Sequence, residues 1–186
     1  AEAEMLLNAT SRGGQDVTGY AAGPLAAHWG LSVVGGYHRQ DRHDLDGDGW
    51  ADIPGYERAT VRPRLFWESE NGARALLTAG AMRESRLGGT LPGQRAPDGQ
   101  PFALTQRTER IDAGAVVDVP GRESDRLQVR ASAMSTDHDH GYGSEQDNDT
   151  HQTGFAEVSY ASGVGATSWL AGIAAQQDRF RSARYA

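Results

Sequence analysis

The sequence alternates apolar and polar residues over most of its length. Between residues 58 and 67, for example, Val61, Leu65 and Trp67 occupy one set of alternate positions, and Arg58 and Arg62 occupy the other. A period of two is typical of β-strands with two chemically different faces. It predicts eight strands and no helix: residues 4–19, 30–40, 56–68, 74–84, 104–119, 125–137, 150–161 and 168–180.

Short and long connections between these segments alternate along the chain. Short turns are predicted at 69–73, 120–124 and 162–167, with 21–29 somewhat longer, and long polar loops at 41–55, 85–103 and 138–149. In an up-and-down sheet this order puts the short turns at one end and the long loops at the other. Bacterial outer-membrane barrels have that asymmetry.

The two faces of the strands predict the surroundings of the sheet. Unpaired arginines buried in a dry core would cost several kcal/mol each, so the arginine-bearing face must be wet or ion-paired. The opposite face carries many small apolar residues, which suit contact with lipid chains. We therefore predict an all-β fold: an antiparallel up-and-down transmembrane β-barrel segment of about eight strands, incomplete and open.

Aromatic residues and one proline refine this prediction. Trp29, Trp67 and Trp169 each fall beside a short turn, where an interfacial girdle would lie. The alternative is that they are core tryptophans. Pro63 in mid-strand predicts a bulge or an interruption of the pairing.

Composition and charge exclude several classes of function. The chain has 186 residues and a net charge of −7, and all its basic residues are arginine, which argues against a nucleic-acid partner. It has no cysteine, so neither a disulfide scaffold nor a cysteine zinc site is open to it. No serine elbow or phosphate-binding glycine loop appears, and we predict no enzyme and no catalytic residue.

An acidic loop between two predicted strands has the spacing of a calcium loop. Its candidate ligands are Asp44, Asp46, Asp48, Trp50 through its carbonyl, and Asp52. Gly55 stands where a bidentate glutamate belongs, so we expect weak Ca²⁺ affinity. A solvated acidic turn without an ion is the alternative.

A second polar cluster lies at residues 137–151. It holds His138, His140 and His151 among several acids, a mixture that could bind a transition metal. The spacing is irregular, and the stretch is typical of a flexible external loop.

Several segments resemble the barrel of TonB-dependent outer-membrane receptors. The most specific stretch is 41–64, which continues through Leu-Phe-Trp and the turn at 70–72; the segments 88–93 and 102–114 are similar to those that follow in such receptors. The resemblance covers most of the chain. It identifies residues 1–186 as a partial barrel domain, the N-terminal part of the barrel after a plug domain that is absent from this sequence.

The resemblance implies a function. Such receptors import a metal chelate or a vitamin, for example a ferric siderophore or a corrinoid, across the bacterial outer membrane with energy delivered by TonB. The implied partners are outer-membrane lipid, the plug domain, the TonB system and the ligand. Arg58, Arg62, Arg64, Arg126 and Arg130, with Glu109 and Asp112, would line the lumen and contact the plug, or simply form a wet wall. Vitamin B12 receptors of this family hold calcium in external loops, which favours Ca²⁺ at Asp44.

Three features separate this sequence from a whole receptor. It predicts about eight strands where the family has about twenty-two, no plug segment precedes them, and the final residues are 184–186, Arg-Tyr-Ala, without the usual terminal aromatic.

Two other architectures stay open. A small eight-stranded outer-membrane barrel, acting as an adhesin or an anchor, predicts that the first and last strands pair. A soluble calcium-binding β-sandwich predicts that Val61, Leu65, Leu127 and Val129 are buried against a second sheet.

Overall fold

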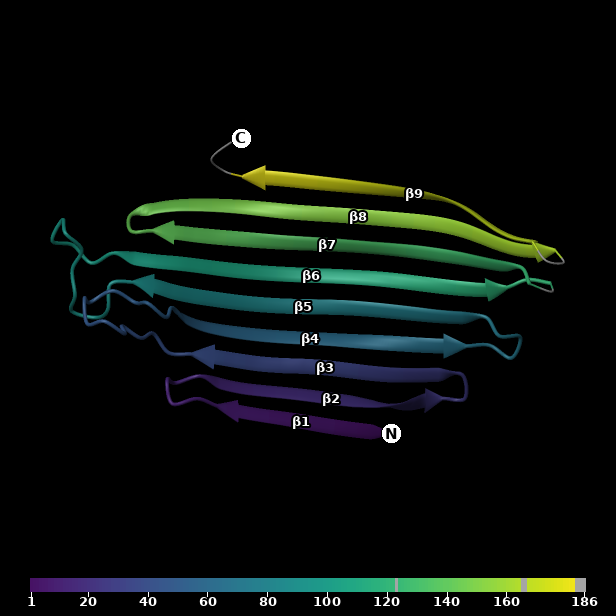
Figure 1. Ribbon diagram of the computed structural model, residues 1–186, viewed down its shortest axis with the longest axis horizontal. Coiled ribbons are helices and arrows are strands. Elements are labelled where there is room, and N and C mark those ends of the chain that lie inside the picture. Colours follow the sequence, from purple (N-terminus) through teal and green to yellow (C-terminus); the bar gives the residue numbers. More distant parts are fainter. Residues whose placement is uncertain (123, 165–166, 183–186) are drawn as a thin grey trace.

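The computed structural model describes residues 1–122, 124–164 and 167–182. They form nine strands and no helix (Figure 1). The strands are β1 (Glu2–Ala9), β2 (Gln15–Ala26), β3 (Trp29–Gln40), β4 (Gly55–Glu68), β5 (Arg74–Gly89), β6 (Ala103–Pro120), β7 (Arg126–Tyr142), β8 (Glu145–Val164) and β9 (Thr167–Ser182). The described part of the chain therefore contains no helix that could span a membrane.

All nine strands belong to one open antiparallel sheet in which each strand pairs with its neighbours in the chain, in the order β1 to β9. This confirms the predicted all-β, up-and-down, unclosed sheet. β1 and β9 are its two edges, and within the described residues they do not pair with each other. The small closed barrel required β1 to pair with β9, and the sandwich required a second sheet. The described residues show neither feature.

Two connections were predicted wrongly, and strand also extends into two others, through Ala26 in the predicted turn 21–29 and through Gly89 in the predicted loop 85–103. Residues 4–19 form two strands, because Thr10 and Gly13 (φ 71°) turn the chain back on itself. The predicted loop at 138–149 is strand on both sides of a tight turn, where Gly143 has a φ of 63°. Positive φ at the first central residue is what a two-residue hairpin turn requires, so a glycine-serine pair replaces the long loop.

Two of the three predicted long loops are present, and both lie at the same end of the sheet, as predicted. Residues 41–54 and 90–102 lie at one end (left in Figure 1), together with the tight turns at 10–14 and 143–144. Residues 27–28 and 69–73 connect the strands at the other end, where β6 and β8 also end. Residues 123, 165 and 166, and the terminal segment 183–186, lie outside the described residues.

One face of the sheet is apolar through the middle of every strand. Cross-strand partners point to the same side, and the register aligns Val33 with Pro63 and, further along the sheet, Ala79 with Ala113 and Ala133. We call this side the apolar face. From the tryptophan row at the short-turn end to the row that contains Ala79, Ala113 and Ala133, its strands carry no charged side chain in the described part of the sheet.

These apolar side chains face solvent in the isolated chain. Ile111 is 66% exposed, Val61 46% and Leu77 44%, and the sole hydrophobic residue buried among the described ones is Ala73. The sandwich prediction also fails here, because Leu127 and Val129 are 38% and 37% exposed. A single-layer sheet without a core cannot gain its stability from internal apolar burial.

The aromatic and proline predictions both have structural counterparts. Trp29 and Trp67 are direct cross-strand partners with ring centroids 6.2 Å apart, and Trp169 lies 5.6 Å from Tyr160, all on the apolar face near the short turns. Around Pro63, pairing with β5 is interrupted between Val61 and Arg64, which confirms the predicted interruption. Pairing with β3 continues past the proline.

Candidate functional site

The opposite side of the sheet, here called the polar face, carries ion pairs between different strands. They include Arg62–Asp112, Arg58–Glu84, Arg126–Asp118 and Arg130–Glu157. Ser32, Glu84, Thr108 and Thr136 on this face are all buried. A sheet that curves toward its polar face covers the polar side chains more than the apolar ones.

Arg62 spans two strands to reach its partner. Its Nη1 lies 2.7 Å from Asp112 Oδ2 on β6, although Arg62 itself belongs to β4. Between them on β5 stands Gly80, the register partner of Asp112. A Cβ on Gly80 would lie 2.8 Å from both Arg62 Cζ and Asp112 Oδ1. Because glycine has no side chain, the guanidinium of Arg62 can cross β5 at Gly80.

Glu84 is the most buried ionisable group of the polar face, with its side chain 5% exposed. Two arginines neutralise it: Arg58 from the adjacent strand, and Arg86, whose Nε lies 2.6 Å from Glu84 Oε1. A carboxylate this covered needs such partners, because an unpaired buried charge is strongly unfavourable.

The predicted lumenal ladder needs one correction. Glu109 lies on the other side of the sheet, where it pairs with Arg83 at 3.2 Å. Residues 109 and 112 are three apart, an odd number, so the two-residue period of a strand sends them to opposite faces. Arg64 lies on the polar face as predicted and forms no ion pair with the described residues.

Part of the predicted calcium site is assembled. The carboxylates of Asp44, Asp46 and Asp48 come together, with one oxygen of each within 4.8 Å of the others, and this group could hold a metal ion. Asp52 lies outside the group, and its carboxylate accepts a hydrogen bond from Leu45 N at 2.7 Å. Trp50 directs its indole toward Phe102, with ring centroids 5.7 Å apart.

Backbone amides already hold the carboxylates of this loop. Gly47 N and Gly49 N donate to the two oxygens of Asp44, both at 2.7 Å, and Trp50 N donates to Asp48 at 2.8 Å. The amides of Gly49 and Gly47 keep the pKa of Asp44 below its ordinary value. Both glycines have positive φ, 82° and 86°, which the tight turn requires.

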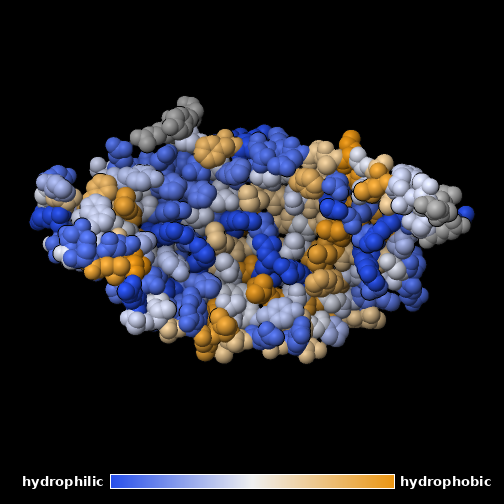
Figure 2. Space-filling view, viewed as in Figure 1, coloured by the Kyte–Doolittle hydropathy of each residue, from blue (hydrophilic) through white to orange (hydrophobic). Residues whose placement is uncertain are grey.

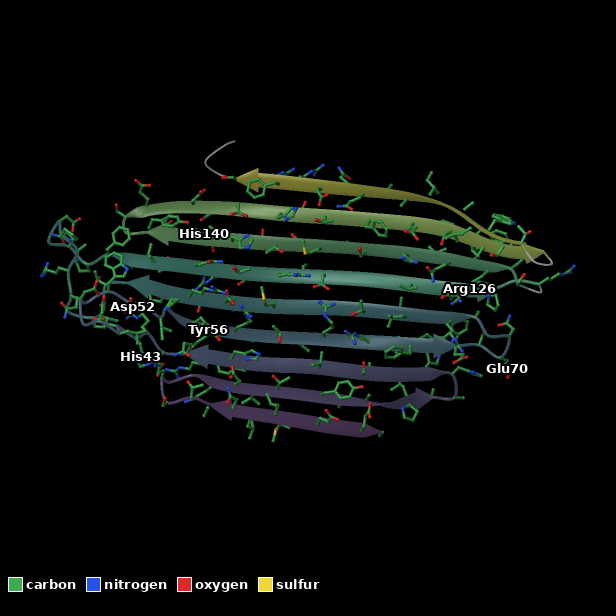
Figure 3. All side chains as sticks on the ribbon, viewed as in Figure 1. His43, Asp52, Tyr56, Glu70, Arg126 and His140 are labelled. Carbon is green, nitrogen blue, oxygen red and sulfur yellow. The ribbon has the colours of Figure 1, made fainter. Side chains whose placement is uncertain are left out.

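The acidic loop is docked on the neighbouring long loop. Ala51 N donates to Gly89 O and Leu91 N donates to Gly49 O, both at 2.9 Å. Phe102, which stacks on Trp50, also reaches the tight turn after β7, because a Cβ on Gly143 would meet its ring at 2.9 Å. Figure 3 shows Asp52 and His43 at this end of the sheet, and Glu70 at the other. The sequence analysis did not predict this docking. Its signal in the sequence is one aromatic residue in each long loop, Trp50 and Phe102.

The histidine cluster lies on strands. His138 and His140 point to the same side of β7, as an i, i+2 pair does, and their rings stack at 5.7 Å. Both face Asp149 on β8: His138 Nδ1 at 3.0 Å and His140 Nε2 at 3.6 Å. His151 lies nearer Asp178, at 3.7 Å. Among the described residues, the three aspartates of the acidic loop are the one group of such side chains close enough to hold a metal.

Comparison of the chain with protein-family models, curated proteins and solved structures finds no match.

Proposed function

We propose that this sheet is part of the wall of a TonB-dependent outer-membrane receptor, which imports a metal chelate or vitamin such as a ferric siderophore or a corrinoid. The observation that carries the proposal is the division of one single-layer sheet into an exposed apolar face and an ion-paired polar face. In water the apolar face would be an extended hydrophobic patch. Against lipid it is solvated, and the polar face looks into a hydrated interior.

The size of the apolar band supports this proposal. On β6 it runs from Ile111 to Val119, nine residues that correspond to roughly 26 Å of strand. A transmembrane strand needs about 9–11 tilted residues. The tryptophan pair at the short-turn end and Tyr37 near the long-loop end bracket the band, where interfacial aromatics belong.

The polar face would then contact the plug domain of the intact receptor. Arg58, Arg62, Arg126 and Arg130 all lie there, each with an acidic partner. Arg126 and Arg130 have side chains 59% and 49% exposed, and ion pairs at a wet surface exchange partners at little cost. They suit a plug that TonB displaces during transport.

Two experiments test the proposal. Refolded chain is mixed with phosphatidylcholine vesicles and floated on a density gradient; it should float with the vesicles, and brominated lipid should quench the fluorescence of Trp67 and Trp169. A chain that stays soluble and monomeric without lipid or detergent contradicts the membrane wall. The open reading frame around the segment tests the family: we expect a plug domain upstream and more strands downstream.

Within this proposal the acidic loop is a Ca²⁺ site of the external surface. The three gathered carboxylates and the positive-φ glycines support it. Affinity should lie near the millimolar range of extracellular modules, because a bidentate ligand at Gly55 is missing. Titration calorimetry with Ca²⁺ should show binding that Asp44→Asn with Asp48→Asn abolishes, while Asp98→Asn, in the adjacent loop, leaves it intact.

A further inference from the structure

A cluster of imidazole and carboxylate groups stands on the polar face of β7 and β8, near the tight turn that joins these strands. His138 and His140 project from β7, and Asp149, the register partner of His138, projects from β8. The cluster lies at the long-loop end, where hydrophilic side chains dominate the molecule (Figure 2) and where Figure 3 labels His140. Neither the proposed wall nor the acidic loop uses these three side chains.

The three donor groups already have part of the geometry of a tetrahedral metal site. His138 Nδ1 lies 3.0 Å from Asp149 Oδ1, and His140 Nε2 lies 3.6 Å from Asp149 Oδ2. Around a tetrahedral ion with bonds of about 2.0–2.1 Å to nitrogen, neighbouring donor atoms are about 3.3 Å apart. Both distances lie close to this separation, so one carboxylate faces two imidazole nitrogens at coordination spacing.

The imidazole rings must still rotate to complete such a site. Among the described residues, these three side chains do not bring one donor atom each within 4.8 Å of one another. The two rings are stacked with their centroids 5.7 Å apart, and rotation of the His140 ring about its side-chain bonds would turn its nitrogen toward an ion without moving the backbone. The backbone itself is fixed by the continuous pairing of β7 with β8.

The charge around the cluster favours a cation. Acids elsewhere on the polar face face an arginine, as Asp112 does. In contrast, the ion pairs of Asp149 with the described residues are to histidines, and Asp147, the register partner of His140, forms no ion pair with them. The nearby arginines of β9 belong to the register rows of the apolar face. No fixed positive charge therefore neutralises the carboxylates of the cluster within the described part of the chain.

We propose that His138, His140 and Asp149 bind a divalent transition-metal ion such as Zn²⁺. Imidazole nitrogens suit Zn²⁺, Ni²⁺ and Cu²⁺, whereas Ca²⁺ and Mg²⁺ prefer oxygen donors. The ion takes the place of the protons through which the two rings face the carboxylate, so its binding releases protons. Two histidines and one carboxylate leave the fourth position to water, as in zinc sites with an open position.

Titration calorimetry of the refolded chain with Zn²⁺ in detergent micelles tests this site, with excess Ca²⁺ in every sample to occupy the acidic loop. One Zn²⁺ should bind. His138→Gln and His140→Gln should each weaken binding at least as much as the roughly 10–100-fold that loss of an outer-shell partner costs. On the unsubstituted chain, Zn²⁺ should protect His138 and His140 from diethyl pyrocarbonate, as located by mass spectrometry, and this measurement does not depend on the folding of a variant.

Two other histidines supply matched controls. His38 also lies on the polar face beside an aspartate, Asp16, at 2.8 Å, but has no second histidine two residues away on its strand. His151 belongs to the same pair of strands as the proposed site but lies nearer Asp178. His38→Gln and His151→Gln should therefore leave Zn²⁺ binding unchanged.

Absence of Zn²⁺ binding, equal losses from all four substitutions, or Zn²⁺ that protects neither His138 nor His140 overturns the metal site. The membrane wall is tested separately by flotation with vesicles, so the two proposals fail by different results.

Discussion

Replacing Gly80 by alanine should disrupt the longest-reaching ion pair of the sheet. The new Cβ would lie 2.8 Å from Arg62 Cζ, so the guanidinium must leave its path across β5. Asp112, with a side chain 15% exposed, and Arg62, 32% exposed, would then lose each other. The added methyl group therefore tests whether this ion pair stabilises the sheet.

The size of the effect follows from this partial burial. Fully buried pairs cost about 3–5 kcal/mol when broken and exposed ones about 0–1 kcal/mol, so a half-buried pair should cost about 1–3 kcal/mol. Alanine in place of glycine within a strand itself returns about 0.5–1 kcal/mol. The net loss should therefore lie between about 0 and 2.5 kcal/mol.

Urea unfolding in detergent micelles, followed by tryptophan fluorescence, measures this loss as a lower midpoint at unchanged slope. Gly154→Ala is the control, because a Cβ there meets no atom within 4 Å. In an Arg62→Ala background, Gly80→Ala should lose most of its cost, since no guanidinium remains to be displaced. Should Gly80→Ala prove no worse than Gly154→Ala, the crossing of Arg62 over β5 is not part of the folded sheet.

Three further predictions use the same preparation. Glu84→Gln should lower the unfolding free energy by about 2–4 kcal/mol, because two arginines lose a buried partner, whereas Glu109→Gln, in an exposed pair, should cost less than about 1 kcal/mol. The pKa of Asp44 is lowered from its ordinary value of 3.8, so the ionised carboxylate stabilises the loop above pH 3.8, and this stabilisation is lost as the pH falls through the lowered pKa. The NMR signal of the Trp50 indole should therefore keep its docked position at mildly acidic pH and shift only at a pH below the lowered pKa. Asp44→Asn should loosen the loop already at neutral pH. A double-mutant cycle of Trp29→Leu and Trp67→Leu should give a coupling of about 0.5–1.5 kcal/mol, and additivity would show that the rings do not interact.

The strands were predictable because their faces differ so strongly. Arg58, Arg62 and Arg64 alternate with Ala59, Val61 and Leu65, and the structure sends the two sets to opposite sides of β4. The wrong predictions came from glycine-containing polar stretches. Gly13 and Gly143 each make a turn from very few residues, and the surrounding acids and histidines have the composition of a loop although they continue the strands.

The site was predictable only in its local part. Asp44, Asp46 and Asp48 are close in sequence, and their approach follows from a tight glycine turn. The contacts of Trp50 with Phe102, and of Arg62 with Asp112 across Gly80, depend on how distant segments align. Register between strands sets those contacts, and the alternation within one strand carries no information about it.

The direction of the edge strands constrains any closed wall built from this sheet. β1 and β9 both run toward the end with the long connections (Figure 1). Direct pairing of these two edges would be parallel, whereas every pairing in the sheet is antiparallel. An antiparallel closure therefore needs an odd number of further strands between β9 and β1, which brings the total to an even number, as in single-chain bacterial outer-membrane barrels. Those strands would also cover the unpaired backbone groups of both edges, which lipid cannot satisfy.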